Sequence, residues 1–207
     1  MYIVTGITRM NQGRICISVF DTRSNRYLRP IPPSGRFTEQ DVRHLGLFSI
    51  VNLDEDNRDH QFQAPHTEDF SVTNNQLQPV GMLNREEQLA LLRRISVQST
   101  FDIFGYNYQD PALKQHRLKY YVLPGTGQNS LGTVQAINVR LYMNAFGNIR
   151  VDFTDFNGNT LRDIPFVSYN AINPEVLNLQ LQRCREKFVR LSLARPFQPD
   201  NWEFRAC

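Results

Sequence analysis

The stretch TVQAINVRLYMNAFGNIRVDFTDFNGNTLRDI, residues 133–164, decides the fold class. Apolar and polar side chains alternate in 133–142 and again in 149–156, which is the period-two pattern of half-buried β-strands. The residues at 157–159 are a strong hairpin-turn sequence and lead into a third segment at 160–164. Three consecutive antiparallel strands are therefore predicted in this part of the chain.

A second set of short β-rich segments fills the first part of the chain, and turn residues separate them. Two weaker strand candidates lie around Phe62 and at 70–72. Short strands joined by tight turns are typical of a small barrel, in which closure removes the exposed sheet edges. The well-defined segments are 2–9, 14–20, 26–31 and 47–53.

Residues 84–96, NREEQLALLRRIS, break the strand pattern and predict a helix. Asn84 suits the N-cap, and the acids of the first turn and the arginines of the last turn complement the helix dipole. Leu89, Leu92 and Ile95 form one apolar stripe, which we expect to pack between the two β-rich parts. The later elements expected are a strand at 119–123, a loop at 124–130, a short helix at 174–185, a strand at 188–197 and a last strand candidate at 202–207.

These elements predict a mainly β protein with a few helices, arranged as two small β-barrels joined by a helix and a loop. The expected boundaries are 1–80 for the first barrel, 81–130 for the linking helix, strand and flexible loop, and 131–207 for the second barrel. No tight sequence repeat relates the two barrels, so any duplication is architectural.

Segments spread over the whole chain resemble those of a known family. They are YIVTGIT (2–8), YLRPI (27–31), PHTEDF (65–70), IRVDFTD (149–155), Gly158, RDIP (162–165), FVRLSLARPF (188–197) and Trp202. On these segments the chain resembles the dual OB-containing proteins, a prokaryotic family named for two tandem OB barrels and associated with phage defence. The resemblance implies two OB-like β-barrels and a role in nucleic-acid binding or complex assembly, and it carries no catalytic residues to transfer.

The charge of the chain is strongly uneven although its net value is only +3. Of the 23 basic residues 20 are arginines, whose planar fork suits phosphate contacts and stacking on bases. Residues 1–36 carry a net charge of +5, and residues 37–80 carry −6. Either the two segments neutralise each other across neighbouring strands, or the first one presents a cationic face that attracts phosphate.

Composition also narrows the cellular setting. The three cysteines form no CxxC pair, which argues against a disulfide framework or a structural zinc site and favours a reducing compartment. The first residues lack the basic and apolar regions of a signal peptide, and no apolar run is long enough for a membrane helix. We therefore expect a cytoplasmic protein with no membrane contact.

An OB barrel binds single strands on one face, with cationic side chains beside aromatic stacking platforms. Because alternate residues of a strand point the same way, Arg14, Cys16, Ser18 and Phe20 are expected to share one face, and Arg140 is expected to share a face with Tyr142. The alternative is that the aromatic residues belong to the core and the arginines are merely solvated. The candidate nucleic-acid-binding residues are Arg14, Phe20, Arg23, Arg26, Tyr27, Arg29, Arg140, Tyr142 and Arg150.

The acids and histidines at 54–69 are the alternative site, because they could supply metal ligands. Their spacing matches neither HExxH nor an EF-hand, and a solvated acidic loop explains 54–59 more simply. No GxSxG or P-loop pattern occurs, although 125–127 reads GTG. We therefore predict no bound metal, no cofactor and no catalytic activity.

The leading functional hypothesis is a non-catalytic accessory subunit that binds single-stranded DNA or RNA within a larger prokaryotic assembly with other protein subunits, with antiviral defence as one setting for that assembly. The second is a protein-interaction scaffold without nucleic-acid contact, in which the same arginines meet acidic partner surfaces. The third is a metal-dependent nuclease that uses the acids at 54–69.

Overall fold

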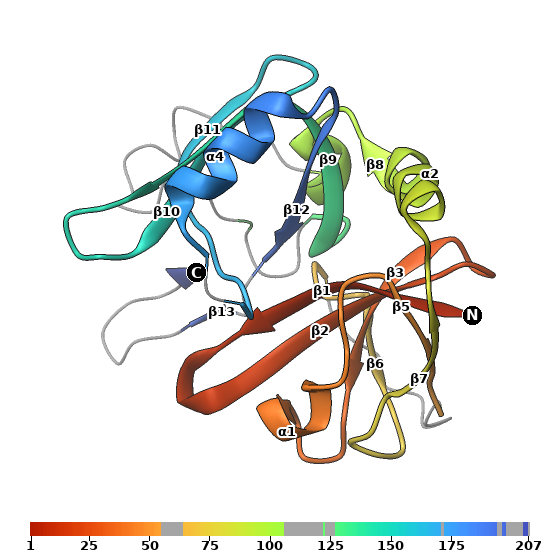
Figure 1. Cartoon of the computed structure of the whole chain (residues 1–207). Coiled ribbons are helices and arrows are strands. Elements are labelled where there is room, and N and C mark those ends of the chain that lie inside the picture. The colour runs from red at the N-terminus through yellow and green to blue at the C-terminus, as the bar shows by residue number, and fades with distance from the viewer. Residues whose placement is uncertain are drawn as a thin grey trace.

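The chain folds into two β-sheets that lie against each other, with four α-helices around them (Figure 1). The computed structural model describes residues 1–54, 64–105, 122, 127–170, 172–193, 196–197 and 205–206, and the counts of elements refer to these residues. The prediction of a mainly β protein with a few helices is confirmed. No helix in this part of the chain is long and apolar enough to cross a membrane.

The first sheet grows from an antiparallel meander of β1, β2 and β3, and its strand order is β6-β3-β2-β1-β5-β7, with β4 paired to β2. On one face of β2, Ile15, Ile17 and Val19 are at most 1% exposed and form the first core. The other face of the meander is turned toward the second sheet. The strands are β1 (Tyr2–Arg9), β2 (Arg14–Asp21), β3 (Arg26–Ile31), β4 (Phe37–Thr38), β5 (Ser49–Asn52), β6 (Asp69–Ser71) and β7 (Gln78–Met82).

The second sheet contains the three antiparallel strands predicted from 133–164, now seen as β9, β10 and β11. Its order is β11-β10-β9-β12, and β8 pairs with β9 in parallel. Phe153 and Leu161 lie in its core with Val134, which is fully buried. The strands are β8 (Ser96–Val97), β9 (Leu131–Met143), β10 (Ile149–Asp155), β11 (Thr160–Pro165) and β12 (Lys187–Ser192), and a separate pair joins β13 (Pro196–Phe197) to β14 (Arg205–Ala206).

Both predicted helices are present, as α2 (Arg85–Ile95) and α4 (Pro174–Arg183). Asn84 caps α2 as expected, because its side chain accepts hydrogen bonds from the first-turn amides. Two shorter helices were not predicted, α1 (Glu39–Val42) and α3 (Thr100–Phe104). Both are too short to show a helical period and are held by capping boxes, so their signal lies in the caps rather than in apolar spacing.

Helix α4 protects an open edge of the second sheet. β12 pairs with β9 only from Leu131 to Ala136, so on that side none of the described strands pairs with the later half of β9. There the Asn178 side chain accepts from the Leu141 amide at 2.9 Å and donates to the Leu141 carbonyl oxygen at 2.8 Å. The amide side chain thus takes the place of a neighbouring strand at one position.

The two closed barrels expected from the sequence are not confirmed, because neither sheet closes among the strands described. In the first sheet β6 is only three residues long and β7 occupies the outer side of β5. The strand candidate around Phe62 lies outside the described residues. So does the one at 119–123, except for Val122, which is buried and belongs to no strand.

Candidate functional site

The face of the first sheet that was predicted to bind nucleic acid is covered by the second sheet. The register of the meander confirms that Arg14, Phe20 and the alternate residues between them share one face. The same face carries Tyr27, which lies opposite Phe20 in the register. It meets β9 and β12 of the second sheet, and we call this contact the inter-sheet junction.

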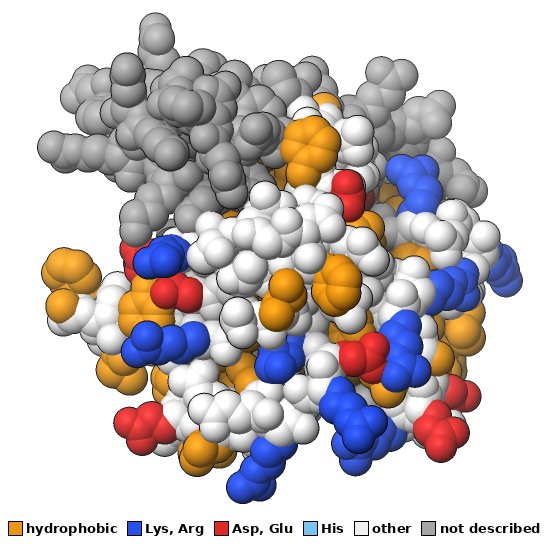
Figure 2. Space-filling view, turned by 90° about the horizontal axis from the view of Figure 1, so that it is seen from above, with side chains coloured by type: hydrophobic (Ala, Val, Ile, Leu, Met, Phe, Trp, Pro, Cys, Tyr) orange, Lys and Arg blue, Asp and Glu red, His pale blue; other side chains and the backbone are white. Residues whose placement is uncertain are grey.

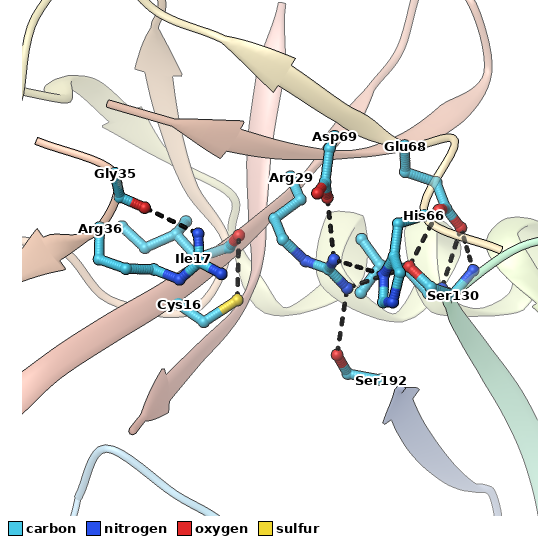
Figure 3. Close-up of polar contacts among 11 residues, drawn as sticks. Cys16, Ile17, Arg29, Gly35, Arg36, His66, Glu68, Asp69, Ser130 and Ser192 are labelled. Carbon is cyan, nitrogen blue, oxygen red and sulfur yellow. Dashed lines mark hydrogen bonds and ion pairs between the residues drawn. The ribbon is translucent and has the colours of Figure 1, made fainter. Parts of the chain in front are cut away.

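Arg29 is the centre of the junction and not part of an exposed groove (Figure 3). Its side chain is 6% exposed, and its Nη1 donates to Asp69 Oδ1 at 2.8 Å in a buried ion pair. The same nitrogen lies 3.0 Å from His66 Nδ1. Its Nη2 donates to the hydroxyls of Ser130 at 3.0 Å and Ser192 at 3.5 Å, which belong to the second half of the chain.

Glu68 reinforces the junction next to Arg29. Its carboxylate accepts from the Ser130 amide at 2.6 Å, from the Ser130 hydroxyl at 3.0 Å and from the Leu131 amide at 2.9 Å. These bonds tie the segment before β6 to the start of β9. Hydrogen bonds to a carboxylate that is 3% exposed are worth more than surface contacts because they compensate for lost hydration.

This network includes three of the residues that were considered as metal ligands in the segment 54–69. His66, Glu68 and Asp69 are all buried and are bound to the guanidinium, amides and hydroxyls of the junction. No group of three or more potential metal ligands occurs within the described ranges. Residues 55–60, which include most of the other acids of that hypothesis, lie outside those ranges.

The two aromatic candidates of the first sheet also belong to the protein interior. Phe20 is 2% exposed and packs with Ile3 of β1 and Leu91 of α2. Tyr27 lies edge-on to Phe20 with ring centroids 5.4 Å apart, and its hydroxyl hydrogen-bonds Thr133 Oγ1 at 2.6 Å. Burial raises the pKa of Tyr27 to about 12. Phe20 and Arg29 are buried, and Tyr27 is partly buried with its hydroxyl bound to Thr133, so we do not include these three in the candidate nucleic-acid surface.

Arg23 and Arg26 remain exposed, and the fold adds two further arginines to them. The turn between β2 and β3 lies against the end of α2, where Arg94 donates to Asn25 Oδ1 at 2.7 Å through Nη2. Figure 2 shows Lys and Arg side chains gathered on the side of the molecule where α2 lies. We call Arg23, Arg26, Arg93 and Arg94 together the turn–helix surface.

The carboxylates next to this surface are already engaged. Glu186 binds Arg93 at 2.6 Å, and this hydrogen bond holds the pKa of Glu186 below its ordinary value. Asp21 accepts from the Ser24 hydroxyl at 2.7 Å and from turn amides. Although burial opposes ionisation of Asp21, these bonds keep its pKa below the usual range. Arg23, Arg26 and Arg94 therefore make no ion pair with any described residue.

Arg14 is exposed but lies apart from the turn–helix surface. It begins β2, and the six residues to Phe20 correspond to about 20 Å of extended chain. One compact groove therefore cannot contain both Arg14 and the arginines of the β2–β3 turn.

The three candidates of the second half do come together on one face of the second sheet. Tyr142 lies directly opposite Arg150, and Arg140 lies opposite Asp152. Tyr142 donates to Asp163 Oδ1 at 3.1 Å, and Arg150 Nε lies 3.8 Å from the same oxygen. Burial and these neighbouring carboxylates raise the pKa of Tyr142. Because two carboxylates balance the two arginines, this face attracts phosphate less than the turn–helix surface does.

Three further arginines of these surfaces, Arg93, Arg94 and Arg190, were not predicted as functional residues from the sequence. The first two were assigned only to the helix dipole, and nothing local indicates that α2 ends beside the β2–β3 turn. Arg190 lies in the middle of an apolar strand sequence, which is itself an unusual position for a charge. Comparisons of the chain with protein-family models, curated proteins and solved structures found no match.

Proposed function

We propose that the protein is a non-catalytic nucleic-acid-binding subunit that captures DNA or RNA strands on the turn–helix surface. The observation that carries the proposal is the gathering of four arginines from two distant segments: Arg93 is paired with Glu186, whereas Arg23, Arg26 and Arg94 make no ion pair with a described residue. Such a surface attracts phosphates with little sequence preference. Stacking on Phe20 and Tyr27 has no part in this proposal, because Phe20 is buried and Tyr27 is partly buried and bound to Thr133.

The strand pairings of the first sheet support the resemblance to dual OB-containing proteins, which we retain as part of the proposal. An OB unit is a five-stranded, partly open Greek-key barrel. Here a three-strand meander is flanked by β5 beside β1 and by β6 running parallel to β3. The Thr73 amide donates to the Asp54 carbonyl oxygen at 3.0 Å, which brings the ends of these flanking strands together.

Anisotropy titration of labelled single-stranded DNA, single-stranded RNA and duplex DNA against salt tests the proposal. Reversing Arg23, Arg26 and Arg94 to Glu is expected to abolish binding near physiological salt. Loss of three phosphate contacts lowers the salt slope for a single strand by about 2. The matched control reverses Arg14, Arg43 and Arg140, which are also exposed and change the net charge equally.

Three outcomes are decisive. Loss of binding in the first variant alone supports the turn–helix surface. Loss in the control alone places the interface elsewhere and overturns the proposal. Absence of binding to all three nucleic acids at about 50 mM salt also overturns it and favours the protein-interaction scaffold.

A further inference from the structure

A pocket of about 230 Å³ opens between the two sheets, beside α2 and the start of β12. Its walls are mainly apolar and include Phe48, Leu92, Ile95 and Phe188. The polar groups that reach it come from both sheets, and Arg190 is one of them. Apolar walls with a small number of polar groups are the usual composition of a small-molecule site.

Arg190 brings an uncompensated charge into this pocket. Its Nε is buried and has no hydrogen-bond partner, whereas the side chain as a whole is partly buried because it borders the pocket. No ion pair or hydrogen bond to its guanidinium occurs within the described parts of the chain. Burial lowers the pKa of Arg190; the neighbouring Cys16 and Tyr27 act in the opposite direction, and the charge of Arg29 adds to the lowering. A buried charge without a partner is costly, and an anion bound beside it would offset that cost.

The two other charged side chains at the pocket have their own partners. Glu186 is bound to Arg93 at 2.6 Å, and the Lys187 ammonium donates to the Cys184 carbonyl oxygen at 3.1 Å. Glu186 therefore does not neutralise Arg190, and Lys187 is itself a cation. The Arg190 guanidinium also packs closely against the backbone of Gly6, since a Cβ atom added to Gly6 would lie 2.5 Å from Arg190 Cζ.

We propose that this pocket binds a small carboxylate with an apolar body, with its carboxylate on Arg190 and its body between Phe48, Leu92 and Phe188. One free guanidinium matches one negative charge, and a carboxylate can accept two parallel N–H bonds from it. The volume equals that of about eight water molecules, which suits a molecule of roughly ten heavy atoms. The pocket adjoins the turn–helix surface through Glu186, which lines it and binds Arg93, but the proposal does not rest on nucleic-acid binding.

Isothermal titration of the full chain with octanoate tests the site, with 1-octanol as the neutral probe of equal length. Saturable binding of one octanoate is expected, with 1-octanol at least tenfold weaker. Arg190→Gln is expected to weaken octanoate binding at least tenfold, whereas Arg185→Gln, which removes an exposed charge nearby, leaves it unchanged.

Two more variants keep the test valid if Arg190→Gln does not fold. Gly6→Ala retains the charge but displaces the guanidinium, and Leu92→Phe fills the pocket. Both are expected to weaken octanoate binding. Absence of octanoate binding, equal binding of octanoate and 1-octanol, or full binding by all pocket variants would overturn the proposal.

Discussion

Replacement of Arg29 by Met tests whether the inter-sheet junction holds the two halves together. The change keeps an unbranched side chain but removes the guanidinium that binds Asp69 and the two serines of the second half. Breaking a buried ion pair from one side costs about 3–5 kcal/mol. With a urea m-value of about 2 kcal/mol/M, a loss of about 4 kcal/mol lowers the unfolding midpoint by about 2 M.

Urea unfolding followed by circular dichroism provides the measurement, and Arg14→Met provides the control. Arg14 is the first residue of β2 and its side chain is exposed, so its replacement is expected to change the free energy of unfolding by less than about 0.5 kcal/mol. The double variant Arg29→Met with Asp69→Asn is expected to recover part of the loss, because it also removes the buried negative charge. A loss below about 1 kcal/mol for Arg29→Met would show that the junction does not hold the fold.

Three further predictions concern single groups. Because burial raises the pKa of Tyr27 to about 12, ultraviolet titration should show one tyrosine that ionises at higher pH than the others, and Tyr27→Phe should remove that signal. The protonated Tyr27 hydroxyl contributes fully to stability below about pH 10, and this contribution is lost as the pH rises through about 12. Ionisation of all tyrosines near the ordinary pKa of about 10 would contradict this prediction. Asn84→Ala should lower the free energy of unfolding by about 1 kcal/mol through loss of the α2 cap, and an unchanged urea midpoint would refute the cap's role. Asp155 is fully buried and accepts from the Thr100 and Asn159 amides, so Asp155→Ala should cost about 3 kcal/mol in the same assay, and a cost below 1 kcal/mol would count against this bond set.

Local patterns predicted local structure well, because strand alternation and helix caps depend on residues that are close together in the sequence. The three strands from 133 to 164 and the Asn84 cap of α2 are examples. Alternation also predicted correctly that Arg14 and Phe20 share a face.

What covers that face could not be predicted, because the covering residues come from more than 100 positions away. The hydroxyls of Ser130 and Thr133 reach Arg29 and Tyr27 only once the second sheet is in place. An arginine beside a tyrosine on a strand looks the same in sequence whether phosphate or the protein's own second half will bind it. Arg94 is the opposite case, a residue that the sequence did not indicate as part of a binding surface. Its place in the turn–helix surface depends on a hydrogen bond to the distant Asn25.

The Arg29–Ser192 bond also bears on how the protein emerges from the ribosome. The two residues are separated by 163 positions, which synthesis at about 5–20 residues per second covers in roughly 10–30 s. Once β7 has been made, part-way through that interval, the first sheet can form its own core, yet its cationic and aromatic face has no complete second sheet to cover it until β12 follows. The nascent chain therefore briefly displays the very face that the finished protein encloses, and this interval is when chaperones or polyanions can reach it.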